Sequence, residues 1–115
     1  MKKILIIEDD INTLQILKYL MDEIHYDVVK FRKLIPIADV IAIKPDIVLI
    51  DHWLPNGRGS DFCLEIKKDP GLSSTAVILI STHDELQALA AESCADAYIQ
   101  KPFDIADLTR LIKSF

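Results

Sequence analysis

The chain has 115 residues, half of them hydrophobic and 27% charged, which is the balance of a single ordinary globular domain over residues 1–115. Its formal net charge of −5 argues against direct binding to nucleic acid, and no apolar run approaches the roughly 20 residues that cross a bilayer. Cys63 and Cys94 lack metal-site spacing, so we expect both cysteines to be reduced. We expect a cytoplasmic protein that binds neither nucleic acid nor membrane.

Short runs of apolar, largely β-branched residues alternate with helix-length segments along the whole chain. The runs that predict strands cover residues 4–7, 26–31, 47–50, 77–80 and 97–99. Apolar residues at helical spacing follow each run, at residues 14–24, 37–41, 62–66, 86–90 and 108–115. Ser60 and Asp104 are expected to cap the third and fifth helices. Strict alternation of strand and helix predicts an α/β fold with a doubly wound parallel sheet.

The carboxyl ends of all strands in a parallel sheet lie at one edge, where open α/β sheets bind their ligands. The polar residues that the runs deliver there are Glu8, Asp9, Asp10, Asp51, Ser81, Thr82 and Lys101. Several carboxylates in one cleft repel one another unless a proton or a cation lies among them. A few oxygen ligands with room for water suit Mg²⁺ or Mn²⁺. Asp51 on its own could equally be a residue that hydrogen-bonds the local backbone. The whole set of polar residues instead indicates a functional site.

This set of side chains allows phosphoryl transfer to a carboxylate. Asp51 could attack a phosphorus centre and become an acyl phosphate. A metal held by Glu8 and Asp9 would offset charge on the phosphoryl oxygens. Ser81 would hydrogen-bond one of those oxygens, and Lys101 would pair with another.

The segments KILIIEDD, PDIVLIDHWLPNGRG, VILIST and AYIQKPF closely resemble, in order and spacing, the receiver domain of two-component response regulators, including chemotaxis receivers. The resemblance covers the whole chain and implies a flavodoxin-like (βα)5 fold with strand order 2-1-3-4-5. It implies that Asp51 is the phosphoacceptor and that Glu8 and Asp9 are the acidic pair. Asp51 and the main-chain carbonyl of Trp53 would complete the ligands of Mg²⁺ or Mn²⁺.

The same resemblance implies how the domain signals. A histidine kinase or a phosphotransfer protein would present a phosphohistidine, and the domain would catalyse transfer to Asp51 with the help of Lys101. Ser81 falls on the switch hydroxyl and Tyr98 on the switch aromatic. Their movement would reshape the surface of the fourth helix, fifth strand and fifth helix, where an output domain, a downstream protein or a second phosphorylated copy would bind. Such a domain catalyses its own phosphorylation and dephosphorylation and has no turnover substrate.

Three other classes of function fit parts of this pattern. A flavin or nucleotide binder of the same fold usually has a Gly- or Ser/Thr-rich loop after its first strand, whereas residues 8–12 here are mostly acidic. A phosphatase with an Asp nucleophile would carry a second Asp where Trp53 stands. A receiver-like module that only binds proteins is the main alternative, although such modules tend to lose one of the site residues. The sequence fits both a free-standing receiver and a part of a longer regulator or hybrid kinase.

Trp53, Thr82 and His83 occupy positions that flank the phosphorylated site in the family that the chain resembles. We predict that they crowd the attacking water and make phosphorylated Asp51 long-lived, while contact with a docked partner is an equal interpretation of Trp53. Trp53→Asn and Thr82→Ala should therefore speed the loss of phosphate, measured as the decay of the phosphorylated protein by intact mass. Unchanged or slower decay in both variants would contradict the prediction.

Overall fold

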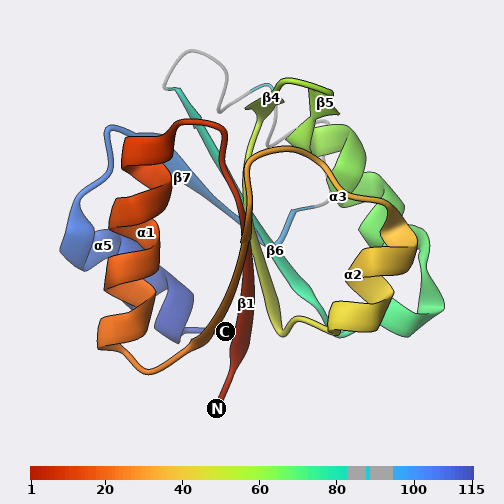
Figure 1. Cartoon of the computed structure of the whole chain (residues 1–115), viewed down its shortest axis with the longest axis horizontal. Helices are drawn as coiled ribbons and strands as arrows, with labels where there is room; N and C mark the ends of the chain where they lie inside the picture. The colour runs from red at the N-terminus through yellow and green to blue at the C-terminus, as the bar shows by residue number, and fades with distance from the viewer. Residues whose placement is uncertain (83–87, 89–94) are drawn as a thin grey trace.

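The computed structural model describes residues 1–82, 88 and 95–115, in which five parallel strands form one sheet (Figure 1). The sheet order is β2-β1-β3-β6-β7, which is the expected order 2-1-3-4-5 when these strands are counted along the chain. The strands are β1 (Lys3–Ile7), β2 (Asp27–Phe31), β3 (Ile47–Asp51), β6 (Ala76–Thr82) and β7 (Ala97–Lys101). The flavodoxin-like α/β fold is therefore confirmed.

Helices cover both faces of the sheet, as Figure 1 shows. On one side lie α1 (Ile11–Glu23) and α5 (Ile105–Lys113), and on the other lie α2 (Ile37–Ile43) and α3 (Gly59–Lys68). A 3-10 turn over Pro70–Leu72 follows α3. The helix expected at residues 86–90 lies outside the described residues. None of the helices that the structure describes is both long and apolar enough to cross a membrane.

The three central strands β1, β3 and β6 contain unbroken apolar runs because successive residues enter two different hydrophobic clusters. Ile4 and Ile6 pack with residues of α1 and α5, whereas Leu5 and Ile7 pack with residues of α2 and α3. Every residue of β3 is buried, including its last, Asp51. Cys63 on α3 is buried in the second cluster, while Cys94 lies outside the described residues. The sheet thus holds the ends of its strands in a rigid frame.

One of the two predicted helix caps is confirmed and the other is wrong. Asp104 Oδ1 accepts a hydrogen bond of 3.0 Å from the Asp107 backbone N–H at the start of α5. Ser60 instead lies inside α3, which begins at Gly59 after a residue without a side-chain cap. The Gly59 N–H donates to the His52 carbonyl at 2.7 Å, and the helix begins two residues earlier than a Ser60 cap would place it.

The segment after β3 forms a small antiparallel hairpin. Its strands are β4 (Trp53–Leu54) and β5 (Gly57–Arg58). A Cβ atom at Gly59 would lie only 2.3 Å from the Asp51 carbonyl oxygen, so α3 starts in direct contact with the end of β3. The hairpin consequently stands beside Asp51 at the carboxyl edge of the sheet (Figure 1).

Candidate functional site

Three strands bring a lysine and two carboxylates together at the carboxyl edge of the sheet. Lys101 Nζ, at the end of β7, donates to Glu8 Oε1 at 2.7 Å and to Asp51 Oδ2 at 3.1 Å. Glu8 follows β1 directly, and Asp51 is the last residue of β3. Because β3 lies next to β1 and the strands are parallel, the side chains that follow the two strands share this edge.

Because this ion-pair cluster is buried, its net charge depends strongly on whether Glu8 carries a proton. Glu8 is 0% exposed, and its burial raises its pKa to about 8; the Asp51 carboxylate adds to the rise and Lys101 opposes it. Burial alone would lower the pKa of the Lys101 ammonium, but Glu8 and Asp51 together raise it. One ammonium group therefore cannot fully offset the two carboxylates around it, and in the absence of another cation this favours a proton on Glu8.

A third carboxylate completes a cluster that fits a divalent cation. One oxygen from each of Glu8, Asp9 and Asp51 lies within 4.8 Å of the other two. Within the described part of the chain, the buried Glu8 Oε2 has no hydrogen-bond partner, although buried polar atoms normally have one. An unpaired buried oxygen beside two further carboxylates is what a small, hard cation would satisfy.

Asp10, the third acidic residue after β1, has a structural role instead. Its Oδ2 accepts hydrogen bonds from the Thr13 backbone N–H at 3.1 Å and from the Thr13 hydroxyl at 2.5 Å. The hydrogen bond from the Thr13 hydroxyl is the main reason that the pKa of Asp10 is lowered. Asp10 is thus the N-cap of α1 and fixes the loop that carries Glu8 and Asp9.

The other residues singled out in the sequence lie around this cluster at different depths. Ser81 is buried on β6, one residue beyond Ile80, which pairs with Asp51, while Thr82 is exposed at the end of that strand. Tyr98 on β7 is partly buried and packs against the cluster that α2 and α3 cover. His83 lies outside the described residues.

Trp53 stands at the start of the hairpin, two residues after Asp51, and is 53% exposed. Its ring packs edge-on against the buried imidazole of His52, with 4.7 Å between the ring centroids. His52, which directly follows β3, is itself buried to 3% exposure.

Two polar side chains near the site were missed in the sequence. The Arg32 guanidinium, just after β2, donates to the Asp9 carbonyl oxygen from Nε at 3.2 Å and from Nη2 at 2.9 Å. The Asn56 amide, at the tip of the hairpin, makes two hydrogen bonds with the backbone of Leu34. Both contacts join side chain to backbone over more than 20 residues, and no periodic pattern in the sequence marks them.

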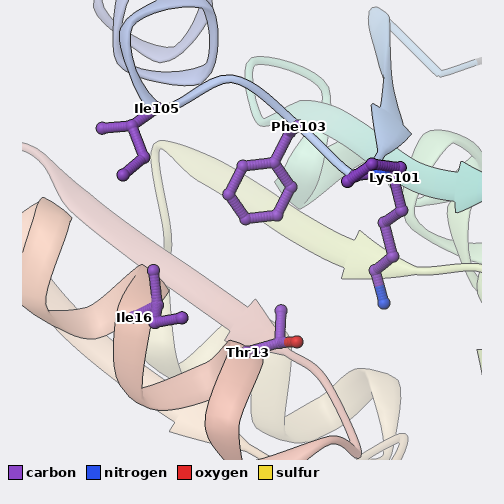
Figure 2. A pocket seen from close by; sticks show the side chains of 6 residues that line it. Thr13, Ile16, Lys101, Phe103 and Ile105 are labelled. Atoms are coloured by element: carbon purple, nitrogen blue, oxygen red, sulfur yellow. The ribbon is translucent and has the colours of Figure 1, made fainter.

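An apolar groove of about 470 Å³ opens next to Lys101, between α1 and the loop from β7 to α5. Figure 2 shows Phe103 and Ile105 on one side of this groove and Thr13 and Ile16 of α1 on the other. Ile16 is 48% and Ile105 is 54% exposed, so the groove has a largely apolar rim in contact with solvent.

Comparison with known families and proteins agrees with this geometry. A model of the response regulator receiver domain matches residues 4–113. The response regulator ArlR of Staphylococcus saprophyticus is 31% identical over 119 residues, covering 99% of this chain and 52% of ArlR. The DNA-binding response regulator MtrA of Mycobacterium leprae is 29% identical over 115 residues, covering 98% of this chain and 50% of MtrA.

Solved structures of receiver domains have the same fold. The signal receiver domain of a histidine kinase from Syntrophus aciditrophicus superposes with a TM-score of 0.89 at 26% identity, covering 99% of this chain and 89% of that chain. The receiver domain of a sensor histidine kinase from Pseudomonas aeruginosa has a TM-score of 0.80 at 21% identity, covering 98% and 95% of the two chains. That structure has a magnesium ion coordinated in its active-site cleft.

The chain spans about half the length of the curated relatives that it matches. Some of those relatives are named as DNA-binding regulators. The expectation that nucleic acid is not a direct partner rests on the charge of these 115 residues alone, and it does not extend to a longer regulator that includes them.

The raised pKa of Glu8 predicts how the stability of the metal-free protein depends on pH. Between pH 4.5 and about 8 the folded state keeps a proton on Glu8 that the unfolded state has lost, so this group lowers the free energy of unfolding as pH rises. In Glu8→Gln this decrease should be absent. Between pH 5 and pH 8.5 the free energy of unfolding of the variant should therefore rise by about 3 kcal/mol relative to that of the parent protein. Urea unfolding with EDTA present measures the difference.

The matched control is Glu65→Gln, which removes an exposed carboxylate on α3 far from the cluster. It should leave the pH dependence of stability as it is in the parent protein. Equal pH dependence in the parent and in Glu8→Gln would contradict the proposed state of Glu8.

Proposed function

This chain belongs to the response regulator receiver domain family, whose members signal in two-component systems through phosphorylation, and on that premise we propose that Asp51 is its phosphoacceptor. The observation that carries the proposal is the contact of Lys101 Nζ with both Glu8 and Asp51 at the carboxyl edge of the sheet. A module that only binds proteins has no need for this buried and electrostatically costly cluster.

The reaction is the transfer of a phosphoryl group from a phosphohistidine of a histidine kinase or phosphotransfer protein. An Asp51 carboxylate oxygen forms a bond to phosphorus while the phosphorus–nitrogen bond breaks, and the freed imidazole nitrogen takes up a proton. Lys101 stays at the site as the ammonium that pairs with a phosphoryl oxygen, and the Ser81 hydroxyl donates to another. The domain thus catalyses its own modification at Asp51, and later its hydrolysis, without a turnover substrate.

The acidic cluster is proposed to hold Mg²⁺ or Mn²⁺ through Glu8, Asp9, Asp51 and the main-chain carbonyl of Trp53. The unpaired Glu8 Oε2 and the mutual proximity of the three carboxylates support this assignment. When bound, the ion offsets the negative charge of the phosphoryl oxygens as they approach the carboxylates.

Phosphorylation is proposed to act on partners through Ser81 and Tyr98. New negative charge on Asp51 would draw the Ser81 hydroxyl toward it, and Tyr98, which is only partly buried, would follow. Tyr98 belongs to β7, and β7 packs against α5. The surface around β7 and α5 is therefore where an output domain, a downstream protein or a second copy would distinguish the two states. The fourth helix expected at residues 86–90 lies outside the described residues.

The lifetime of the phosphorylated state is proposed to depend on Trp53, Thr82 and His83. Trp53 and Thr82 are both exposed at the carboxyl edge, one on the hairpin after Asp51 and the other at the end of β6. Exposed side chains at this edge restrict the approach of water without taking part in the transfer itself.

The groove between α1 and α5 is proposed to receive the protein that carries the phosphohistidine. Lys101 lies in both the groove and the acidic cluster, so a protein seated in the groove would bring its imidazole to Asp51. Exposed apolar side chains such as Ile16 and Ile105 fit an apolar surface of that protein.

The first prediction from this proposal concerns the phosphoacceptor itself. Incubation with Mg²⁺ and acetyl phosphate should add the mass of one phosphoryl group to the intact protein. The gain should be absent with EDTA and in Asp51→Asn, which keeps the shape of the side chain and removes its nucleophilic oxygen. If neither acetyl phosphate nor any of a panel of phosphorylated histidine kinases adds this mass, the binding-only alternative is favoured.

A second prediction separates the donor groove from the chemistry. With a phosphorylated kinase or phosphotransfer protein that modifies the parent chain, Ile16→Ser and Ile105→Ser should slow transfer about tenfold relative to the rate with acetyl phosphate. Leu64→Ser, which changes an exposed apolar residue on α3, is the matched control and should leave this ratio unchanged. An unchanged ratio in the two groove variants would place the donor elsewhere.

A further inference from the structure

The three residues that follow β2, Arg32 to Leu34, touch both loops that carry the proposed metal ligands. Arg32 reaches the first loop, where two of its guanidinium nitrogens donate to the single carbonyl oxygen of Asp9. This contact fixes the main chain of Asp9 from outside the acidic cluster and leaves the Asp9 carboxylate for the cluster.

The other end of this segment holds the hairpin that follows Asp51. Asn56 Oδ1 accepts from the Leu34 N–H at 2.9 Å, and Asn56 Nδ2 donates to the Leu34 carbonyl at 3.0 Å. The Asn56 amide therefore satisfies both backbone groups of one residue, as a neighbouring strand would. A Cβ atom at Gly57 would lie 2.7 Å from Leu34 Cδ1, so the hairpin rests directly on this side chain. Leu34 in turn packs against the core cluster under α2 and α3.

The sheet itself holds each loop by the backbone only at its first residue, where the Glu8 N–H donates to the Phe31 carbonyl at 3.1 Å and the His52 N–H donates to the Ile80 carbonyl at 2.9 Å. Asp9 lies beyond the end of β1, and Trp53 belongs to a separate hairpin of only four paired residues. A cation that takes ligands from two independent loops must order both of them, and that ordering weakens its binding unless the loops are already held in place.

We propose that residues 32–34 act as a strap that holds the two ligand-bearing loops in place, with Arg32 and Asn56 as positioning residues for the cation site. The inference rests on the proposed function, because it takes Asp9 and the Trp53 main-chain carbonyl as ligands. It adds a role for two side chains that touch neither the cation nor the phosphoryl group.

The positive charge of Arg32 and its hydrogen bonds to the Asp9 main chain have opposite effects on the affinity for Mg²⁺, so a titration can tell them apart. Removing a cation near three carboxylates increases the local negative potential, and that change alone would strengthen the binding of Mg²⁺. Loss of the strap would weaken it. The sign of the change in affinity therefore distinguishes a positioning residue from a charge that merely lies nearby.

The test is a titration of the full chain with MgCl₂, followed by the fluorescence of Trp53, the single tryptophan. Arg32→Ala and Asn56→Ala should each raise the dissociation constant for Mg²⁺ about two- to tenfold, the range expected for losing hydrogen bonds of ordinary strength. The titration is run far below the thermal midpoint of each variant. A general loss of stability would then lower the midpoint of urea unfolding and leave the dissociation constant unchanged.

Two matched controls isolate the contacts of the strap. Lys33→Ala removes the same charge from the next residue, for which no contact with Asp9 is seen, and should leave Mg²⁺ affinity equal or slightly higher. Arg58→Ala alters the same hairpin as Asn56 but removes only an exposed pair with Asp61, and should leave the affinity unchanged.

The outcomes separate this inference from the function on which it rests. Failure of the parent protein to bind Mg²⁺ would overturn the proposed cation site and the strap with it. Binding by the parent protein, with Arg32→Ala and Asn56→Ala as tight as their controls or tighter, would overturn the strap alone.

Discussion

The ammonium group of Lys101, shared between two carboxylates, is the interaction on which the rest of the site depends. Lys101 lies 93 residues from Glu8 along the chain, and its ammonium group donates to the carboxylates of both Glu8 and Asp51. Its single charge leaves negative charge uncompensated in a buried place, which favours either a proton on Glu8 or a metal ion. The proposed binding of a cation and the proposed transfer of a phosphoryl group to Asp51 would thus have one electrostatic origin.

The positions of the site residues could be predicted from the sequence because strand ends are sharply marked in it. The apolar runs before Glu8 and Asp51 stop at a carboxylate, and a parallel sheet requires that such ends meet at one edge. Lys101 follows from the same reasoning applied to the last strand. The order of the strands does not follow from these runs and came from the resemblance to a family. The roles of Ser81 and Tyr98 rest on that resemblance as well, since nothing in their local sequence indicates movement.

The parts that sequence patterns did not reveal depend on contacts between loops. Serine is a common helix cap, but Ser60 lies inside α3. The helix begins before it, at Gly59, whose N–H donates to the His52 carbonyl. The hairpin has too few residues to show alternation, and its burial of His52 follows from the path of the chain. Arg32 and Asn56 bind backbone atoms rather than side chains, so the identity of their partners leaves no trace in composition or spacing.

The topology of the sheet also has a consequence for how the chain folds. No two adjacent strands of the central sheet are joined by a hairpin, and the paired residues Ile4 and Ile47, or Ile47 and Ala76, are separated by long stretches of chain. Each ladder therefore requires the closure of a large loop, which slows folding relative to helical or hairpin proteins. Because the cluster needs β1, β3 and β7 together, a partly folded chain has no complete site. On the proposed function, a chain in which any of these three strands is unpaired would not be phosphorylated at Asp51.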